Sequence, residues 1–344
     1  MHDILKTLVE LGASDLHLAV GRKPRARIHG RLEDMPFPVL DAKRMASCMK
    51  SIVTRDRYAT FEETGDLDFA FELEGVARFR CNYLATYGGL AAVLRVVSDT
   101  IIPLETLNLP PLLQELTTRK SGLILVTGPT GSGKSTTLAA LIDVINANQP
   151  RHIILIEDPV EFVHSSKTGF ITQREVGTHT ESFAAALRGA VREDPDVILV
   201  GEMRDQETVS MTLTAAEMGF LVFGTLHTNG AGKTIDRLVD IFPEERQPLV
   251  RNQLANSLVA IISQLLLPAS GGEGRVAVCE TLVSMPAFRK LVREGHTHMV
   301  PSYMQQHRAH GCLSMDEAIV GRVASGHVDR DQAIHYLRDP ELLA

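Results

Sequence analysis

A glycine-rich segment in the middle of the chain has the residue types that bind phosphate. Gly128-Pro-Thr-Gly-Ser-Gly-Lys-Ser135 fits the pattern G-x-x-x-x-G-K-[S/T], between an apolar segment and a segment of helical periodicity. Its glycines let backbone N–H groups surround phosphate oxygens, while Lys134 reaches the outer phosphates and Ser135 ligates Mg²⁺. The flanking segments disfavour the alternative, an ordinary glycine-rich turn. The segment predicts ATP or GTP bound with Mg²⁺ by Gly128, Pro129, Thr130, Gly131, Ser132, Gly133, Lys134, Ser135 and Thr136.

Carboxylates follow two apolar segments that are predicted to be strands. Residues 197–200 lead, after one glycine, to Glu202, and residues 153–156 lead into an acidic loop at residues 157–161. Phosphoryl transfer to water requires an acid beside the metal and a group that orients the water. We therefore predict Glu202 as the carboxylate on the metal side and Glu161 as the base. Taken alone, each acid is explained equally well as a solvated loop residue or a helix cap.

A histidine and three arginines are further candidates. His227 follows the apolar segment 221–225, where a hydrogen bond to the γ-phosphate would make it a sensor. Arg78, Arg80 and Arg95 lie on the polar face of predicted strands, where they are suited to reach a neighbouring subunit's nucleotide. A packed histidine and solvated strand faces are the simpler explanations.

The pattern of apolar and polar residues differs between the two parts of the chain. Residues 14–97 alternate apolar and polar side chains, as at 66–74 and 77–83, with one helical segment at 42–52. This pattern predicts a small α+β domain with a mainly antiparallel sheet, ending near Val97. Prolines then mark a connection at residues 98–110, followed by a short helix at 111–119.

The rest of the chain has the pattern of an α/β domain. Short apolar runs at residues 123–127, 152–156, 197–200 and 221–225 alternate with helical stretches, which predicts a parallel sheet covered by helices on both faces. Beyond Pro243 we expect mainly helix, apart from a hairpin at residues 271–274 that leads into residues 275–283. The predicted domains are 1–100, a linker at 101–119, and 120–344.

The composition is typical of a folded protein that does not attract nucleic acid. The 344 residues are 44% hydrophobic and carry a net charge of −7. The apolar stretch at residues 258–267 is interrupted by Ser263 and Gln264, and it is shorter than the roughly 20 residues of a membrane span. No leader pattern is evident, so we expect a cytoplasmic protein.

Cysteine and histidine spacing favours no metal centre. The four cysteines are far apart, which predicts reduced packing residues at Cys48, Cys81, Cys279 and Cys312. A cluster late in the chain fits no common zinc spacing and consists of His296, His298, His307, His310 and Cys312.

Taken together, these segments resemble the secretion and pilus-motor ATPases, and most closely the type IV pilus retraction ATPases of twitching motility. Residues 13–18 (ASDLHL) resemble the start of that family's PAS-like domain, and residues 75–80 (GVARFR) its arginine-bearing strand. Residues 157–162 resemble its Asp box, 192–205 its Walker B segment and 224–228 its His box. Assembly and type II secretion ATPases typically carry a tetracysteine site and an extra amino-terminal domain, and we expect neither feature in this protein.

The resemblance implies a RecA-like ATPase domain preceded by the PAS-like domain. It implies a hexamer that binds ATP and Mg²⁺ between the two domains of one subunit, with arginines of the next subunit at the nucleotide. In this family Glu161 would activate water, Glu202 would be the Walker B acid and His227 the γ-phosphate sensor. The expected location is the inner-membrane base of the pilus, where a platform protein and a paralogous motor subunit are implied partners.

Two other functions compete with a retraction motor. An accessory paralogue or scaffold would bind ATP and support another pilus or type II secretion motor while hydrolysing little. The intact Lys134, Glu161 and Glu202 argue against it. A kinase for a small metabolite is disfavoured because no acceptor pocket or lid segment is evident in the sequence.

Overall fold

The chain consists of two compact units, each described here by itself. The computed structural model describes residues 1–28, 30–97, 100–272 and 274–343. One unit comprises Met1–Thr100 with Glu161–Val163, and the other Ile101–Val160 and His164–Ala344. Residues 98 and 99 of the predicted connection, residue 273 of the predicted hairpin and residue 344 at the predicted domain end lie outside the described residues.

The first unit is an antiparallel sheet with three helices. Its six strands follow the order β3-β2-β1-β6-β5-β4. Their bounds are β1 Asp15–Ala19, β2 Arg25–Ile28, β3 Arg31–Asp34, β4 Asp66–Leu73, β5 Ala77–Thr86 and β6 Gly89–Val97. The helices are α1 His2–Glu10, α2 Ala42–Lys50 and α3 Arg55–Thr64. The predicted strands and the predicted helix at residues 42–52 are confirmed, whereas α3 was not expected.

Side-chain alternation along β5 explains how this sheet packs. Phe79, Cys81 and Tyr83 are buried in the core of the unit, while Arg80 between them is exposed. Successive side chains of a strand point to opposite faces, so one face packs on the helices and the other carries the arginines. The buried Tyr83 hydroxyl donates to the carbonyl of Met49 at the end of α2, at 2.9 Å.

The second unit is built on a mixed seven-stranded sheet. Its order is β13-β12-β7-β11-β10-β8-β9. The bounds are β7 Gly122–Thr127, β8 His152–Glu157, β9 Phe170–Glu175, β10 Val197–Val200, β11 Leu221–Leu226, β12 Leu258–Pro268 and β13 Arg275–Val283. The expectation of a wholly parallel sheet is wrong at one edge, because β13 pairs antiparallel with β12.

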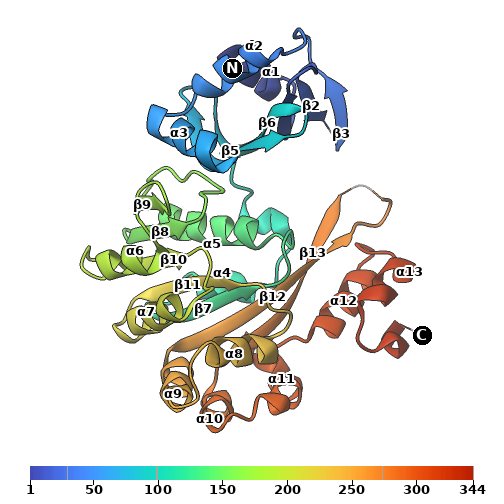
Figure 1. Ribbon diagram of the computed structural model, residues 1–344. Coiled ribbons are helices and arrows are strands. Elements are labelled where there is room, and N and C mark those ends of the chain that lie inside the picture. The colour runs from blue at the N-terminus through green and yellow to red at the C-terminus, as the bar shows by residue number, and fades with distance from the viewer. Residues whose placement is uncertain (29, 98–99, 273, 344) are drawn as a thin grey trace. The chain divides into compact units, whose positions relative to one another are not determined.

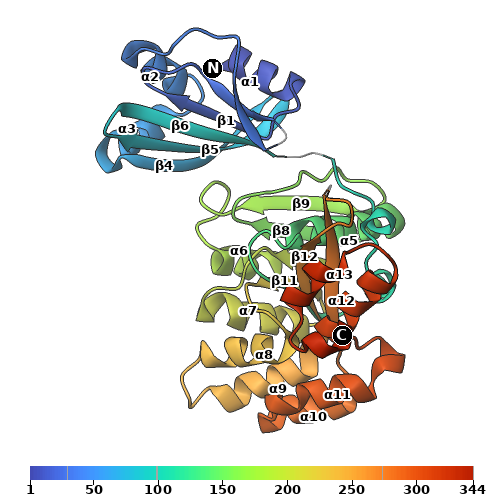
Figure 2. The same cartoon turned by 90° about the vertical axis from the view of Figure 1, so that its right-hand side faces the viewer.

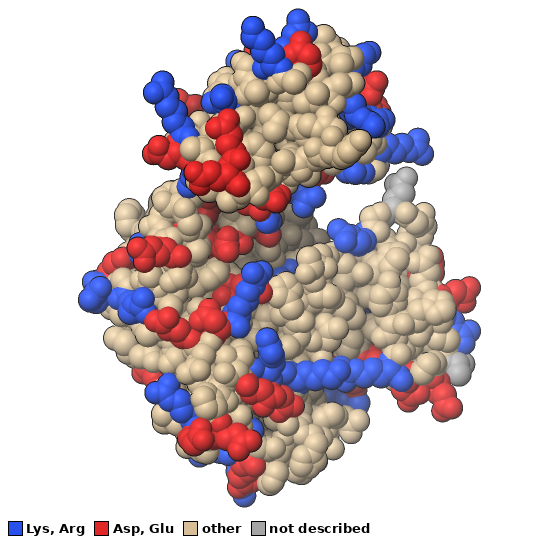
Figure 3. All heavy atoms as spheres, in the orientation of Figure 1, with Lys and Arg blue, Asp and Glu red and all other residues tan. Residues whose placement is uncertain are grey.

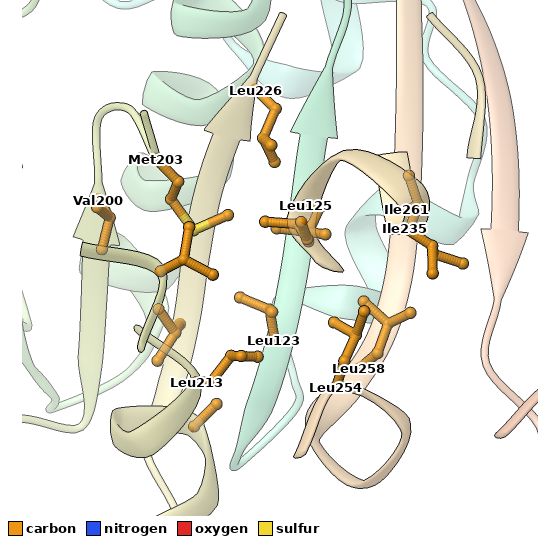
Figure 4. Close-up of a cluster of buried hydrophobic side chains, with 14 of the residues drawn as sticks. Leu123, Leu125, Val200, Met203, Leu213, Leu226, Ile235, Leu254, Leu258 and Ile261 are labelled. Carbon is orange, nitrogen blue, oxygen red and sulfur yellow. The ribbon is translucent and has the colours of Figure 1, made fainter. Parts of the chain in front are cut away.

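Helices cover both faces of this sheet, as predicted (Figures 1 and 2). One face packs against α4 Leu112–Leu116 and α5 Lys134–Asn148. The other packs against α6 Phe183–Ala190, α7 Gln206–Glu217, α8 Ala231–Asp240, α9 Gln247–Ser257, α10 Pro286–Glu294 and α11 Val300–Gln306. Leu123 and Leu125 of β7 point into this second cluster, in which Figure 4 also shows Met203 and Ile261. The intervening Ile124 and Val126 point to the opposite face.

The region beyond Pro243 contains more strand than expected. The apolar segment at 258–267 is not helical but forms most of β12, which pairs with β7 inside the sheet. The predicted hairpin into residues 275–283 is confirmed. Its distal part packs against α12 Met315–Ala324 and α13 Arg330–Ala333 through a separate cluster that includes Leu267, Val278 and Ile319. Short 3-10 turns lie at Leu104–Leu107, Thr297–Met299, Arg308–His310, Ile334–Tyr336 and Pro340–Leu343.

The cysteines are free thiols that pack inside the units. Cys81, Cys279 and Cys312 are buried, and Cys48 is half-buried. Burial raises the pKa of Cys279 to about 12 and also raises the pKa of Cys81 and Cys312. Among the described residues, no three or more histidine, cysteine or acidic side chains are grouped so that they could hold a metal ion by themselves.

Charged side chains of both signs are interspersed on the face of the molecule in Figure 3. No helix among the described residues combines the length and the apolar composition needed to cross a bilayer.

Candidate nucleotide site

The phosphate-binding loop lies between a buried strand and the start of a helix. Every residue of β7 is buried, and α5 begins at Lys134 with Gly133 as its N-cap. Gly128 has a φ of 141°, and a Cβ there would lie 2.2 Å from the backbone oxygen of Gln264. Only glycine fits at this close approach, because any other side chain would collide with β12.

Lys134 is folded onto this loop. Its side chain is almost buried, and Nζ donates to the carbonyls of Gly128 and Pro129 at 2.9 and 3.1 Å. These carbonyls partly satisfy the buried ammonium group. The lysine lies within the loop whose glycines can admit phosphate, which is the arrangement expected from the motif.

Glu202 is separated from the end of β10 by Gly201, and the close approach of β8 explains why a glycine is found there. A Cβ on Gly201 would lie 3.0 Å from the carbonyl oxygen of Ile156 in β8, and the Gly201 N–H donates to that same oxygen at 2.7 Å. The end of β10 therefore lies so close to β8 that the position favours glycine, and the acid comes one residue later.

The Glu202 carboxylate interacts with two cationic or polar side chains. Its Oε1 lies 2.5 Å from Nε of Arg204 and 3.1 Å from Nε2 of His227. Burial alone would raise the pKa of Glu202, but the hydrogen bond from Arg204 and the nearby His227 outweigh burial and lower it. Glu202 is therefore ionised at neutral pH and available to a cation.

His227 connects this carboxylate to the phosphate-binding loop. Its Nδ1 lies 3.5 Å from the hydroxyl oxygen of Thr130, while Nε2 contacts Glu202. The structure thus brings together residues from three predicted segments: the loop after β7, the acid after β10 and the histidine after β11. Parallel strands end at one edge of a sheet, which explains the convergence.

The acidic loop after β8 is held by side chains from β9. Glu175 is buried and accepts the N–H of Val160 at 3.1 Å, and Gln173 donates to Glu157 at 3.1 Å. Glu161 comes directly after Val160 and is exposed. It belongs to the segment Glu161–Val163, and its role as a base stays a prediction.

The three predicted arginines lie in the first unit. Arg80 and Arg95 are directly opposite each other on β5 and β6, and Arg78 lies two residues before Arg80 on the same face. Arg95 Nε donates to Asp15 Oδ1 at 2.7 Å although the Arg95 side chain is 66% exposed. A contact of these arginines with another subunit's nucleotide stays a prediction.

Comparison with known proteins places this geometry in a family. The model of the type II/IV secretion system proteins matches residues 1–334. The chain is 47% identical to a twitching motility protein of Neisseria gonorrhoeae, covering 93% of this chain and 86% of that protein. It is 45% identical to the type IV pilus retraction ATPase PilT of Pseudomonas aeruginosa, covering 98% of both. The chain belongs to the type II/IV secretion system protein family.

A solved structure agrees with this membership of the secretion ATPase family. The crystal structure of the pilus retraction motor PilT with bound ADP superposes with a TM-score of 0.91 at 47% identity, covering 98% of this chain and 97% of that one. The α/β architecture with its mixed sheet is therefore that of a secretion ATPase.

Sequence reasoning missed several residues of this secretion ATPase site. Gln264 of β12 is buried against the phosphate-binding loop, and Arg204 contacts Glu202. Beside Gln264, the Ser263 hydroxyl accepts the N–H of Gly230, and Glu280 of β13 accepts the N–H of Ala231 at the start of α8. The sequence did contain one indication of these residues, the polar pair Ser263 and Gln264 inside an apolar segment. Buried polar side chains require hydrogen-bond partners, so this pair predicts a contact with another polar part of the protein.

Proposed function

We propose that this chain is a Mg²⁺-dependent ATPase that drives retraction of type IV pili in twitching motility. The main support for this proposal is the similarity to a pilus retraction ATPase over 98% of both chains. The contacts of Lys134, Glu202 and His227 at one edge of the sheet support it, because they give the nucleotide site its phosphate-binding and metal-side groups.

In this proposal the loop residues 128–136 bind the phosphates of ATP. Lys134 exchanges its carbonyl partners for phosphate oxygens, to which its charge is attracted more strongly. His227 would report the γ-phosphate, because it already lies between Thr130 of the loop and Glu202. Glu161 would accept a proton from the attacking water as general base.

The residues present fit a magnesium ion. Ser135 offers a hydroxyl directly after Lys134, and Glu202 offers an ionised, mostly buried carboxylate. Hard oxygen ligands of this kind suit Mg²⁺, which commonly takes only one or two protein ligands together with substrate phosphates. The ion would neutralise charge on the phosphates, and Ser135 and Glu202 would hold it.

The proposal also covers the oligomeric state of the protein and its location in the cell. A ring, by similarity a hexamer, would place Arg78, Arg80 or Arg95 of one subunit at the nucleotide of the next, and the first unit would be PAS-like. The force would act on a platform protein at the inner-membrane base of the pilus, from the cytoplasmic side, with a paralogous motor subunit as a further partner. An arginine supplied from a neighbouring subunit contributes about 10³ to 10⁵ in rate in other nucleotide hydrolases.

The test is ATP hydrolysis per subunit, measured over a wide range of protein concentration. We expect specific activity to rise as subunits associate, and Glu161→Gln to reduce turnover by roughly 10²-fold or more, since it removes the base but leaves the shape of the side chain. Lys134→Ala should abolish the activity. Restored twitching in cells that lack their own retraction ATPase would then connect hydrolysis to retraction.

Two results would contradict a motor. Turnover unchanged in Lys134→Ala would show that the hydrolysis does not use this site. ATP binding without turnover at every concentration would favour the accessory scaffold, a nucleotide-dependent partner of another motor.

A further inference from the structure

Gln264 joins the strand β12 to the phosphate-binding loop through two side-chain hydrogen bonds. Gln264 is only 1% exposed. The amide Nε2 donates to the carbonyl of Ser132 at 2.7 Å, and Oε1 accepts the hydroxyl of Thr137 at 2.9 Å. Ser132 and Thr137 are themselves buried. One amide therefore holds both the end of the loop and the first turn of α5.

The bond to Ser132 determines how the next peptide group is oriented. A peptide unit is planar and trans, so its carbonyl and its N–H point in opposite directions. Because the Ser132 carbonyl is held by Gln264, the N–H of Gly133 must point away from β12. Backbone N–H groups of such a loop are the donors that bind phosphate oxygens.

The surroundings leave this peptide little freedom to turn. A Cβ on Gly133 would lie 2.8 Å from Gln264 Nε2, and a Cβ on Gly128 would lie 2.2 Å from the Gln264 carbonyl. The loop thus contacts the same residue near its start and near its end. If Gln264 lost its amide, the Ser132 carbonyl would be buried without this donor, and the peptide could relieve that cost by rotating.

We infer that Gln264 is a positioning residue for nucleotide binding, which orients the Ser132–Gly133 peptide so that the Gly133 N–H faces the phosphates. This inference rests on the proposed function, since it concerns the same site. Gln264 does not touch the reacting atoms. It acts through the loop, so its loss should weaken the binding of ATP and ADP alike and leave the chemical step nearly unchanged.

The test compares Gln264→Leu with the unaltered protein in ADP titrations and in ATP hydrolysis. Leucine has a similar size but neither donates nor accepts a hydrogen bond. We expect the Kd for ADP and the KM for ATP to rise about tenfold, with kcat changed less than about twofold. Thr137→Val, which removes the hydroxyl partner of the same amide, should raise both constants by a smaller factor.

Gln149→Leu is the matched control. Gln149 also donates Nε2 to a backbone carbonyl, that of Thr117 at 3.0 Å, but it follows the opposite end of α5. This variant loses the same kind of bond at a half-buried position, so a smaller drop in Tm is expected with unchanged Kd and KM. A general loss of stability would instead raise the constants in both glutamine variants.

The outcomes separate the inference from the function. Wild-type Kd and KM in Gln264→Leu would overturn the positioning role while leaving the ATPase intact. If Gln264→Leu does not fold, Thr137→Val decides, and unchanged constants there overturn the inference. If the unaltered protein binds ADP but does not hydrolyse ATP, the proposed function is wrong, and the ADP titration still tests Gln264. No nucleotide binding by the unaltered protein would overturn both.

Discussion

Asp15 is a charged residue that is only 5% exposed. It accepts hydrogen bonds from Ser14 Oγ and Arg95 Nε, both at 2.7 Å, and Arg27 Nε lies 3.9 Å away. Burial raises the pKa of Asp15, while the bonds from Ser14 and Arg95 outweigh burial and lower it below the usual 3.8. The ionised carboxylate therefore holds Arg95 in place on the open face of the first sheet.

Asp15→Asn should lower the free energy of unfolding of the first unit by about 1.5–3 kcal/mol near neutral pH, because it removes charged hydrogen bonds from a buried group. The folded-state pKa lies below 3.8, so the contribution is complete above that value and is lost as the pH falls through the folded-state pKa. Urea unfolding from neutral pH down to about pH 3 measures it, as the difference between variant and wild type should shrink with acid.

Asp34→Asn is the control for Asp15. Asp34 pairs with Arg25 at 3.1 Å, but its side chain is 58% exposed. Such an exposed pair contributes roughly 0–1 kcal/mol. Equal losses in the two variants would show that burial of Asp15 adds nothing.

At the scale of elements, two glycines of the phosphate-binding loop differ in their contact with β12. Gly128→Ala brings a methyl group to 2.2 Å from a backbone oxygen of β12, whereas Gly131 has open space around its Cβ position and only its φ of 78° opposes alanine. Gly128→Ala should reduce ADP affinity by more than about tenfold, and Gly131→Ala should cost about 1 kcal/mol of stability. Isothermal titration measures the ADP affinity of both variants, and thermal melting measures their stability. Equal ADP affinities of Gly128→Ala and Gly131→Ala would contradict the prediction.

Much of the fold follows from local patterns, and so does the central part of the site. The apolar runs at β7, β8, β10 and β11 predicted these strands, and the rule that parallel strands end at one edge predicted that Glu202 and His227 lie near the loop. The roles of Glu161 and the arginines are not decided by these patterns.

The pattern was insufficient at β12. The eleven residues of β12 are apolar except for Ser263 and Gln264, and they have no period that distinguishes a buried strand from a buried helix. The partner of Gln264 is Ser132, 132 positions away in the chain. Only the fold brings these two residues together, because neither periodicity nor motif spacing relates them.

At the scale of the whole molecule, the units have separate hydrophobic cores. Every residue of the first core lies within Met1–Thr100, and Phe79 is completely buried there. Phe223 is equally buried in the second unit, in the cluster under α5. Each core therefore depends on its own side chains.

Phe79→Ala and Phe223→Ala should each destabilise one unit by about 3–5 kcal/mol, because each leaves a cavity in one core. Differential scanning calorimetry should show two transitions, with each variant lowering a different one. A single transition shifted equally by both substitutions would mean that the units unfold together.

The distribution of the cysteines has a practical consequence for following this molecule in motion. Cys81, Cys279 and Cys312 are buried with raised pKa values, while Cys48 is half-buried. Maleimide reagents attack the thiolate, so under native conditions they should attach at Cys48 first. The natural chain thus offers one preferred position for a fluorophore, on the unit that carries Arg78, Arg80 and Arg95, without prior removal of its other thiols.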